Sequence, residues 1–187
     1  IVNLGDTSYR RCTDTAIKAL ISLNDKIPEV KLLLVGDSSV DEELKALAYS
    51  FGLSEYVSFE GWQDVSLFPS YVQASSICIS PLKRNKHHDT TFANKLFQYM
   101  AMGKPVIVSN SITQANVVNE ENCGLVFQAD NEVELAACIL KLYEQKELAT
   151  ELGENGRKAV LKRWNWDLTS RDLIETYKDI SIKLLDQ

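Results

Sequence analysis

Basic residues gather in the middle of this acidic chain. The net charge of the 187 residues is -6, yet the only acidic residue between positions 65 and 119 is Asp89. The same stretch holds five basic residues, namely Lys83, Arg84, Lys86, Lys95 and Lys104. Arg10 and Arg11 form a second basic pair near the start of the chain. If strand ends bring the two groups together, they attract an anion such as phosphate; the alternative is a solvated basic surface.

Apolar segments that alternate with helical patterns predict the elements that position these residues. The run from Val30 to Gly36 is nearly continuous in apolar residues, which is typical of a parallel strand covered on both faces. The alternation predicts an α/β fold, a doubly wound Rossmann-like parallel sheet with helices on both faces. The expected strands are Ile1–Leu4, Val30–Gly36, Val57–Phe59, Ser76–Ser80, Pro105–Ser109 and Gly124–Phe127. Both basic groups then follow carboxyl ends of strands, where open sheets of this class bind ligands.

The helix expected from Ala93 to Met102 begins without an acidic residue in its first turn. Phe92, Leu96 and Met100 share one apolar face, so the helix can pack and still direct its first turn outwards. The free N–H groups of that turn suit a phosphate, and Gly103 is expected to end the helix. The alternative is an ordinary core helix with a neutral N-cap.

Composition excludes several classes of protein. The chain is 45% hydrophobic and is expected to fold as one domain, residues 1–187. Its acidic balance argues against nucleic acid as a partner, and no apolar run approaches membrane-spanning length. The start at Ile1 reads as a strand already under way, so we expect a chain cut from a longer protein.

The cysteines and histidines predict no metal site. Four isolated cysteines favour a reducing cytoplasm without structural zinc, and Cys78 and Cys138 are expected in the core. His87 and His88 are the only histidines, and Asp89 alone does not complete a zinc site. We expect both histidines in a solvent-exposed loop near the site. No Ser-His-Asp arrangement is present.

Five motifs occur in order along the chain: "KLLLVGDSS", "VSFEGW", "NKLFQYMAMGKPVIVSN", "NCGLVF" and "RWNWD". As a set they resemble the C-terminal, donor-binding domain of a GT-B retaining glycosyltransferase of the fourth sequence family, the group 1 glycosyl transferases. The resemblance covers nearly the whole chain. It implies transfer of a sugar from a nucleotide diphosphate sugar with retention, without a metal or other cofactor. The chain also lacks an Asp-x-Asp pair, the usual sign of metal-bridged phosphates.

The resemblance also implies an N-terminal acceptor-binding domain that is absent from this chain, so the chain alone should bind donor and transfer nothing. The acceptor would be a glycan or a lipid-linked molecule, and the location cytoplasmic. Peripheral membrane association through the absent half is compatible with this interpretation.

Two glutamates separated by seven residues are the hallmark of that family. The first faces the donor sugar and the second holds the ribose; the matching positions here are Thr90 and Gln98. Gln98 can still hydrogen-bond to ribose hydroxyls, whereas Thr90 supplies only a neutral hydroxyl. Two alternatives therefore stay open: a catalytically degenerate nucleotide-sugar-binding half, and a sugar-nucleotide epimerase on the same fold.

The remaining donor contacts follow from the same resemblance. The diphosphate-binding residues would be Gly5, Arg10, Arg11, Phe92, Ala93, Asn94 and Lys95. The base would be held by Gly61, Trp62 and Gln63. For Lys95 the alternative is a solvated helix residue, and for Trp62 it is a side chain that covers the sheet edge.

Overall fold

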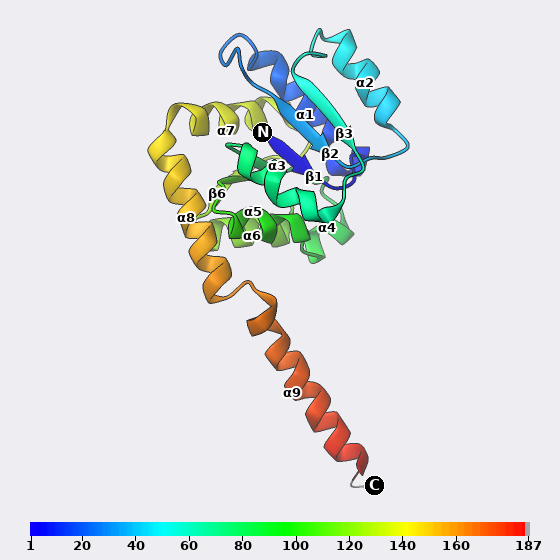
Figure 1. Ribbon diagram of the computed structural model, residues 1–187, viewed down its shortest axis with the longest axis vertical. Coiled ribbons are helices and arrows are strands. Elements are labelled where there is room, and N and C mark those ends of the chain that lie inside the picture. The colour runs from blue at the N-terminus through cyan, green and yellow to red at the C-terminus, as the bar shows by residue number, and fades with distance from the viewer. Residues whose placement is uncertain (186–187) are drawn as a thin grey trace.

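Six parallel strands form the centre of the computed structural model, which describes residues 1–185 (Figure 1). The strand order is β3-β2-β1-β4-β5-β6, so the direction of strand addition reverses between β1 and β4. This arrangement confirms the predicted doubly wound sheet, and ligands of such sheets bind at the point of reversal. The strands are β1 (Val2–Leu4), β2 (Leu32–Val35), β3 (Val57–Gly61), β4 (Cys78–Ser80), β5 (Val106–Ser109) and β6 (Gly124–Phe127).

Helices cover both faces of the sheet. One face carries α1 (Thr13–Ala19), α2 (Asp41–Ser50) and α7 (Glu132–Glu144). The other carries α3 (Phe68–Ala74), α5 (Asn94–Ala101), α6 (Ile112–Glu120) and the C-terminal part of α8 (Lys146–Lys162). The short helix α4 (Lys86–Thr90) lies between β4 and α5, and α9 (Trp166–Leu185) ends the chain. Single 3-10 turns are η1 (Tyr9–Arg11), η2 (Leu20–Ser22) and η3 (Val65–Leu67).

The alternation of side chains along a strand divides the core in two. In β2, Leu32 and Leu34 pack with the helices of one face and Val35 with those of the other. All three are almost inaccessible to solvent. Burying one such side chain stabilises the fold by about 1.5 to 3 kcal/mol, which explains why β2 consists of apolar residues throughout.

The cysteines lie in or beside this core. Cys78 is fully buried, as predicted, and Cys138 is partly buried against the core. Burial raises the pKa of the Cys12, Cys78 and Cys123 thiols to about 12. At neutral pH these three side chains are therefore packing groups rather than nucleophiles.

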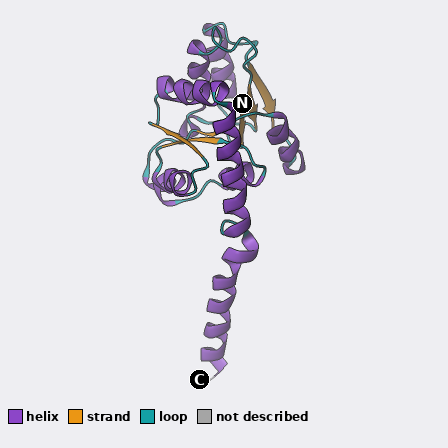
Figure 2. Ribbon diagram, turned by 90° about the vertical axis from the view of Figure 1, so that its left-hand side faces the viewer, coloured by secondary structure: helices purple, strands orange, loops and turns teal. Residues whose placement is uncertain are grey.

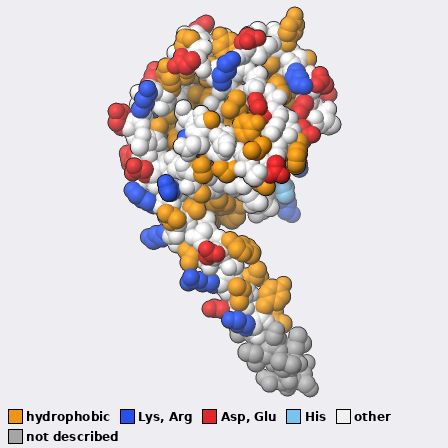
Figure 3. All heavy atoms as spheres, viewed as in Figure 1, with side chains coloured by type: hydrophobic (Ala, Val, Ile, Leu, Met, Phe, Trp, Pro, Cys, Tyr) orange, Lys and Arg blue, Asp and Glu red, His pale blue; other side chains and the backbone are white. Residues whose placement is uncertain are grey.

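Helix α9 projects away from the rest of the molecule (Figures 1 and 2). The spacing of Leu173, Tyr177, Ile180 and Leu184 predicts one apolar stripe on this helix. The first three side chains are 48%, 65% and 48% exposed, and Figure 3 shows apolar side chains along the projecting helix. The sequence predicts that this stripe, with Trp164 and Trp166 before it, packs partly on this chain and partly on the absent half. Trp164 does pack against the core. Packing of the three exposed side chains on the absent half stays a prediction. The fourth stripe position, Leu184, lies outside the side chains that the structure describes. Among the helices of residues 1–185, none combines the length and the hydropathy that a membrane span requires.

Candidate functional site

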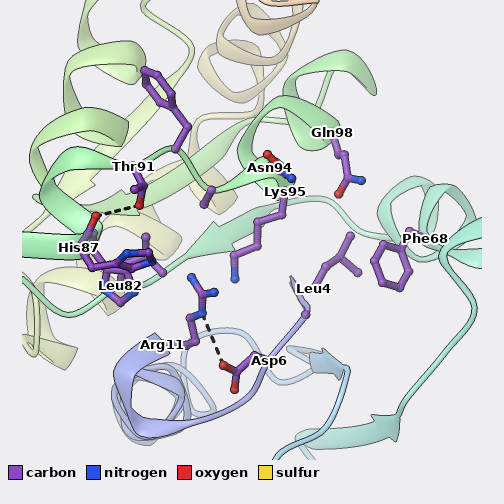
Figure 4. A pocket seen from close by; sticks show the side chains of 14 residues that line it. Leu4, Asp6, Arg11, Phe68, Leu82, His87, Thr91, Asn94, Lys95 and Gln98 are labelled. Carbon is purple, nitrogen blue, oxygen red and sulfur yellow. Dashed lines mark hydrogen bonds and ion pairs between the residues drawn. The ribbon is translucent and has the colours of Figure 1, made fainter. Parts of the chain in front are cut away.

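A cleft of about 350 Å³ opens where β1 and β4 separate (Figure 4). The two strands share a single register pair, Val2 with Cys78. Beyond that pair, the N–H of Leu4 donates to the hydroxyl of buried Tyr99 at 2.8 Å instead of to β4. The cleft is lined by Leu4, Gly5, Asp6, Arg11, Phe68, Leu82, His87, His88, Thr91, Phe92, Ala93, Asn94, Lys95 and Gln98.

The first turn of α5 forms one wall of this cleft. Its N-cap is Ala93, which offers no side-chain acceptor to the free N–H groups, and no acidic residue lies in the turn. Leu96, Tyr99 and Met100 are fully buried and fix the helix against the sheet. Gly103, at a φ of 69°, follows the helix end as predicted. The free N–H groups of this turn and the positive end of the helix dipole therefore face the cleft. The turn itself carries no acidic side chain that would neutralise them.

The loop after β1 forms the opposite wall. Gly5 has a φ of 89°, a conformation that favours glycine, and its N–H donates to Val35 at 2.7 Å. A Cβ on neighbouring Gly36 would lie 2.2 Å from the Gly5 carbonyl oxygen, so the two backbones approach too closely for a side chain. These glycines let β1 and β2 end together and turn the loop towards the cleft.

Asp6 separates the two predicted phosphate-binding arginines. Its carboxylate accepts from Arg10 Nε at 2.9 Å and from the backbone N–H of Ser8 at 2.8 Å. Burial opposes ionisation of Asp6, but these hydrogen bonds outweigh it and lower its pKa. Arg10 is thereby held at the surface, 58% exposed and outside the cleft lining. Arg11 is more buried, lies 3.9 Å from Asp6, and directs its guanidinium into the cleft (Figure 4).

Lys95 reaches the cleft from α5 and points towards Arg11 (Figure 4). Its Nζ donates to Oδ1 of Asn3 at 2.6 Å, and the Asn3 side chain is fully buried. Burial, and then the positive charge of Arg11, lower the pKa of Lys95 to about 7. The solvated alternative for Lys95 therefore does not describe its surroundings, because its amino group lies against the end of β1.

The two histidines lie in α4 rather than in a solvent loop. His87 is exposed, but His88 is buried, and its Nδ1 lies 2.8 Å from the carbonyl oxygen of Lys83. Burial lowers the pKa of His88. The predicted loop is wrong here because Asn85 caps a short helix, accepting from the N–H of His88 at 2.8 Å, and α4 then packs on α6. Both histidines line the cleft, so their predicted position near the site is correct.

Gln98 and Thr90, at the two glutamate-matching positions, differ in their placement. Gln98 is exposed, one turn into α5, and its amide lies at the cleft (Figure 4). Thr90 is outside the cleft lining, and its hydroxyl donates to the Lys86 carbonyl at 2.7 Å. Thr91 lines the cleft instead, with its hydroxyl donating to His87 at 2.8 Å. Both threonine hydroxyls therefore donate to backbone carbonyls, so neither can donate to a ligand in this arrangement.

The predicted base-binding segment ends β3, two strands away from β1 at the same edge of the sheet. Trp62 is 72% exposed, and Gln63 Nε2 donates to Glu60 at 2.8 Å. Gly61, Trp62 and Gln63 do not line the cleft itself. The exposed indole has an open face on which a planar group could stack.

The structure also adds residues that sequence reasoning missed. Phe68 comes from the start of α3, and Leu82 lies just after β4. No pattern in the sequence marks Phe68, because its role depends on where α3 crosses the sheet edge. Asp6 did have a signal, since an acid four residues before Arg10 predicts an ion pair. Among the described residues, no group of three His, Cys, Asp or Glu side chains is arranged to hold a metal ion.

Comparison with known proteins identifies the family. The family model "Glycosyl transferases group 1" matches residues 1–159. The chain belongs to the group 1 glycosyl transferases. One curated relative of this group 1 chain is a GDP-mannose-dependent alpha-(1-6)-phosphatidylinositol monomannoside mannosyltransferase of Mycobacterium tuberculosis, 26% identical over 177 residues. That match covers 94% of this chain and 46% of the relative, so the chain spans about half the length of the curated relatives it matches.

Solved structures share the fold of this group 1 chain. A crystal structure of Anabaena Alr3699/HepE in complex with UDP has a TM-score of 0.83 at 20% identity, covering 95% of this chain and 48% of that one. The C-terminal domain of a group 1 family protein (LpcC) of Francisella tularensis has a TM-score of 0.74 at 18% identity, covering 88% of this chain and 85% of that one. The predicted fold, one half of a GT-B architecture, is confirmed.

Proposed function

We propose that this chain is the donor-binding half of a glycosyltransferase and binds a nucleotide diphosphate sugar in the cleft between β1 and β4. The observation that carries the proposal is the convergence of Arg11, Lys95 and the uncapped N-terminus of α5 on one cleft. Each of these groups favours a negatively charged oxygen, and together they match a diphosphate rather than a single carboxylate. The UDP bound to Anabaena Alr3699/HepE and the GDP-mannose dependence of the mycobacterial relative support the same ligand class.

In this proposal the diphosphate lies against Gly5, Arg11 and the turn from Phe92 to Lys95. Gln98 hydrogen-bonds to the ribose, and the base extends along the sheet edge towards Gly61, Trp62 and Gln63. When the glycosidic bond to phosphate breaks, negative charge grows on the leaving oxygen. Arg11, Lys95 and the helix N-terminus stabilise that charge, and retention and metal independence are part of the proposal. The acceptor, a glycan or lipid-linked molecule, would be bound by the N-terminal half outside this chain.

A second candidate, a nucleotide-sugar-binding half with reduced or lost transfer activity, is favoured by one observation. Asp6 is the only carboxylate among the cleft-lining residues that the structure describes, and it is engaged by Arg10. Thr90, at the position that faces the sugar in the family, is outside the lining. Transfer assays on a protein that contains both halves separate the candidates, since product forms only with the first.

Ligand binding itself is tested by thermal shift with UDP, GDP, ADP and their sugars, using the free nucleosides and glucose as controls. A ligand at one hundred times its Kd stabilises the folded chain by about 2.7 kcal/mol. We expect at least one diphosphate ligand to raise Tm while its nucleoside does not. If every diphosphate leaves Tm unchanged at millimolar concentration, the proposed site is wrong.

A further inference from the structure

The amino group of Lys95 lies in the gap where β1 and β4 separate. Because the strands share only the pair Val2 and Cys78, groups at the end of β1 need partners other than β4. Residues four apart on a helix share a face, and α5 supplies two such partners. Tyr99 accepts the N–H of Leu4 at 2.8 Å, and Lys95 donates to Oδ1 of Asn3 at 2.6 Å. Lys95 is therefore directed into the sheet opening rather than along the helix surface.

Asn3 holds the ammonium group without neutralising it. The Asn3 side chain is fully buried, its Oδ1 accepts from Lys95, and its Nδ2 has no hydrogen-bond partner in the described chain. An amide contributes a dipole but no charge. The hydrogen-bond partner of the Lys95 amino group is therefore a neutral amide and not a carboxylate.

The other charged and titratable groups near Lys95 also leave an excess of positive charge. Arg11, from the loop after β1, repels the Lys95 ammonium, and Asp6 attracts it. Asp6 is itself shared between Arg10 and Arg11. The remaining titratable groups of the cleft lining are His87 and His88 of α4, which add no negative charge. Three basic side chains, Arg10, Arg11 and Lys95, therefore share the single carboxylate of Asp6.

We propose that Lys95 binds a proton together with the anionic ligand, so that the occupied cleft carries more positive charge than the empty one. The inference rests on the proposed function, because it needs a diphosphate at the point where Lys95 and Arg11 converge. Negative charge there favours the protonated amine, and an amine with a pKa near 7 in the empty cleft is only partly protonated at neutral pH. A nucleotide diphosphate sugar has no phosphate that titrates near neutrality, so the proton is taken up by the protein.

This coupling gives the affinity a defined dependence on pH. Below about pH 7, Lys95 is protonated with and without ligand, so its contribution to Kd is constant. Above that pH the ligand-free form loses the proton first, and the affinity falls by up to about tenfold per pH unit until Lys95 in the complex also titrates. Arginine at this position stays charged throughout, so Lys95→Arg should remove this part of the pH dependence.

The test is an NMR titration of the chain labelled with ¹³C at the lysine side chains, from pH 5.5 to 10, without ligand and with saturating UDP-glucose. GDP-mannose replaces UDP-glucose if the latter does not bind. The Lys95 resonance is assigned by its loss in Lys95→Arg, while Lys158→Arg, at a 74% exposed position, serves as the matched control. We expect the free Lys95 amine to titrate near pH 7 and its midpoint to rise by at least one pH unit with ligand. The Kd of wild type and Lys158→Arg should weaken above pH 7, and that of Lys95→Arg should weaken less.

Two results overturn the inference separately from the proposed function. If the nucleotide sugar binds, seen by shifts of other resonances, but Lys95 titrates as an ordinary lysine or does not move, only the proton coupling is wrong. If neither nucleotide sugar perturbs any resonance, the proposed function is wrong and the coupling falls with it. The ligand-free titration still measures Lys95 in that case.

Discussion

The indole of Trp164 stacks on the ring of Phe97, with 5.4 Å between ring centroids. Phe92, at the cleft, contacts both rings edge-on at 5.6 Å. The Trp164 Nε1–H also donates to Glu121 Oε1 at 2.8 Å. Because Trp164 lies between α8 and α9, this aromatic cluster connects the cleft rim with the segment from which α9 departs.

Replacing Trp164 should destabilise the fold. Trp164→Ala removes both ring contacts and the hydrogen bond to Glu121, so we expect a loss of about 2 to 4 kcal/mol in the free energy of unfolding. The matched control is Trp166→Ala, because Trp166 is 71% exposed and should cost less than about 0.5 kcal/mol. Urea unfolding of both variants measures the difference, and equal losses would contradict the role given to the cluster.

The two neighbouring arginines should differ in their effect on binding. Arg11→Ala is expected to weaken nucleoside diphosphate binding by about 1.5 to 3 kcal/mol, the range for charged hydrogen bonds, and to leave free nucleoside binding nearly unchanged. Arg10→Ala should cost less than about 0.5 kcal/mol, because Asp6 holds Arg10 away from the cleft. Calorimetric titration gives both values. A larger loss for Arg10→Ala than for Arg11→Ala would reverse the assignment.

Gln98 should act through the ribose. Gln98→Glu keeps the length of the side chain, and a carboxylate makes stronger hydrogen bonds to hydroxyls, so affinity should hold or rise by about 1 kcal/mol. Gln98→Leu should lose affinity for the normal nucleoside diphosphate but not for its 2′,3′-dideoxy analogue. Titration of both variants with both ligands checks this. If Gln98→Leu binds the normal ligand as well as wild type does, Gln98 is only a surface residue of α5.

The partly buried position of Lys95 should make stability depend on pH. The pKa of Lys95 in the folded chain, about 7, lies below its ordinary value of 10.5, so between these values the unfolded chain binds more protons than the folded chain. The free energy of unfolding therefore rises with pH across this window, by at most about 1.4 kcal/mol per pH unit, and the full cost of the buried charge is present below pH 7.

The variant Lys95→Met lacks that cost, so the stability of wild type relative to Lys95→Met should increase from pH 7 to pH 10. Lys158→Met is the control, and its difference from wild type should stay constant because Lys158 is exposed. Urea unfolding at pH 7, 8, 9 and 10 measures both differences. If the stability difference between wild type and Lys95→Met does not change with pH, the amine of Lys95 in the folded wild-type chain stays charged over this range.

Helix α9 should exchange its amide hydrogens faster than the sheet does. Leu173, Tyr177 and Ile180 are exposed, whereas the strands β1 and β4 are buried throughout. We expect the amides around Ile180 to exchange within the time in which those of Val2 to Leu4 stay protected. The last turns, from Ile180 to Gln187, are expected to fray, and residues 186 and 187 lie outside the described part of the chain. Protection of Ile180 equal to that of β1 would mean that another surface covers α9.

The sequence by itself determined the order and kind of most elements. Apolar runs such as Val30 to Gly36 require burial on two faces whatever their neighbours are, and Gly103 followed by Pro105 ends α5 through local backbone geometry alone. Membership of the group 1 family was likewise contained in the ordered motifs, and the family model confirms it over residues 1–159.

Only the tertiary structure decided which charged side chains face the cleft. Arg10 and Arg11 are adjacent and alike in sequence, but Arg10 hydrogen-bonds to Asp6 at the surface, whereas Arg11 lies 3.9 Å from Asp6 and lines the cleft. Lys95 could have been a solvated helix residue, and it enters the sheet opening because β1 and β4 diverge after one register pair. The choice for Lys95 depends on its contact with Asn3, 92 positions away, which no local pattern encodes.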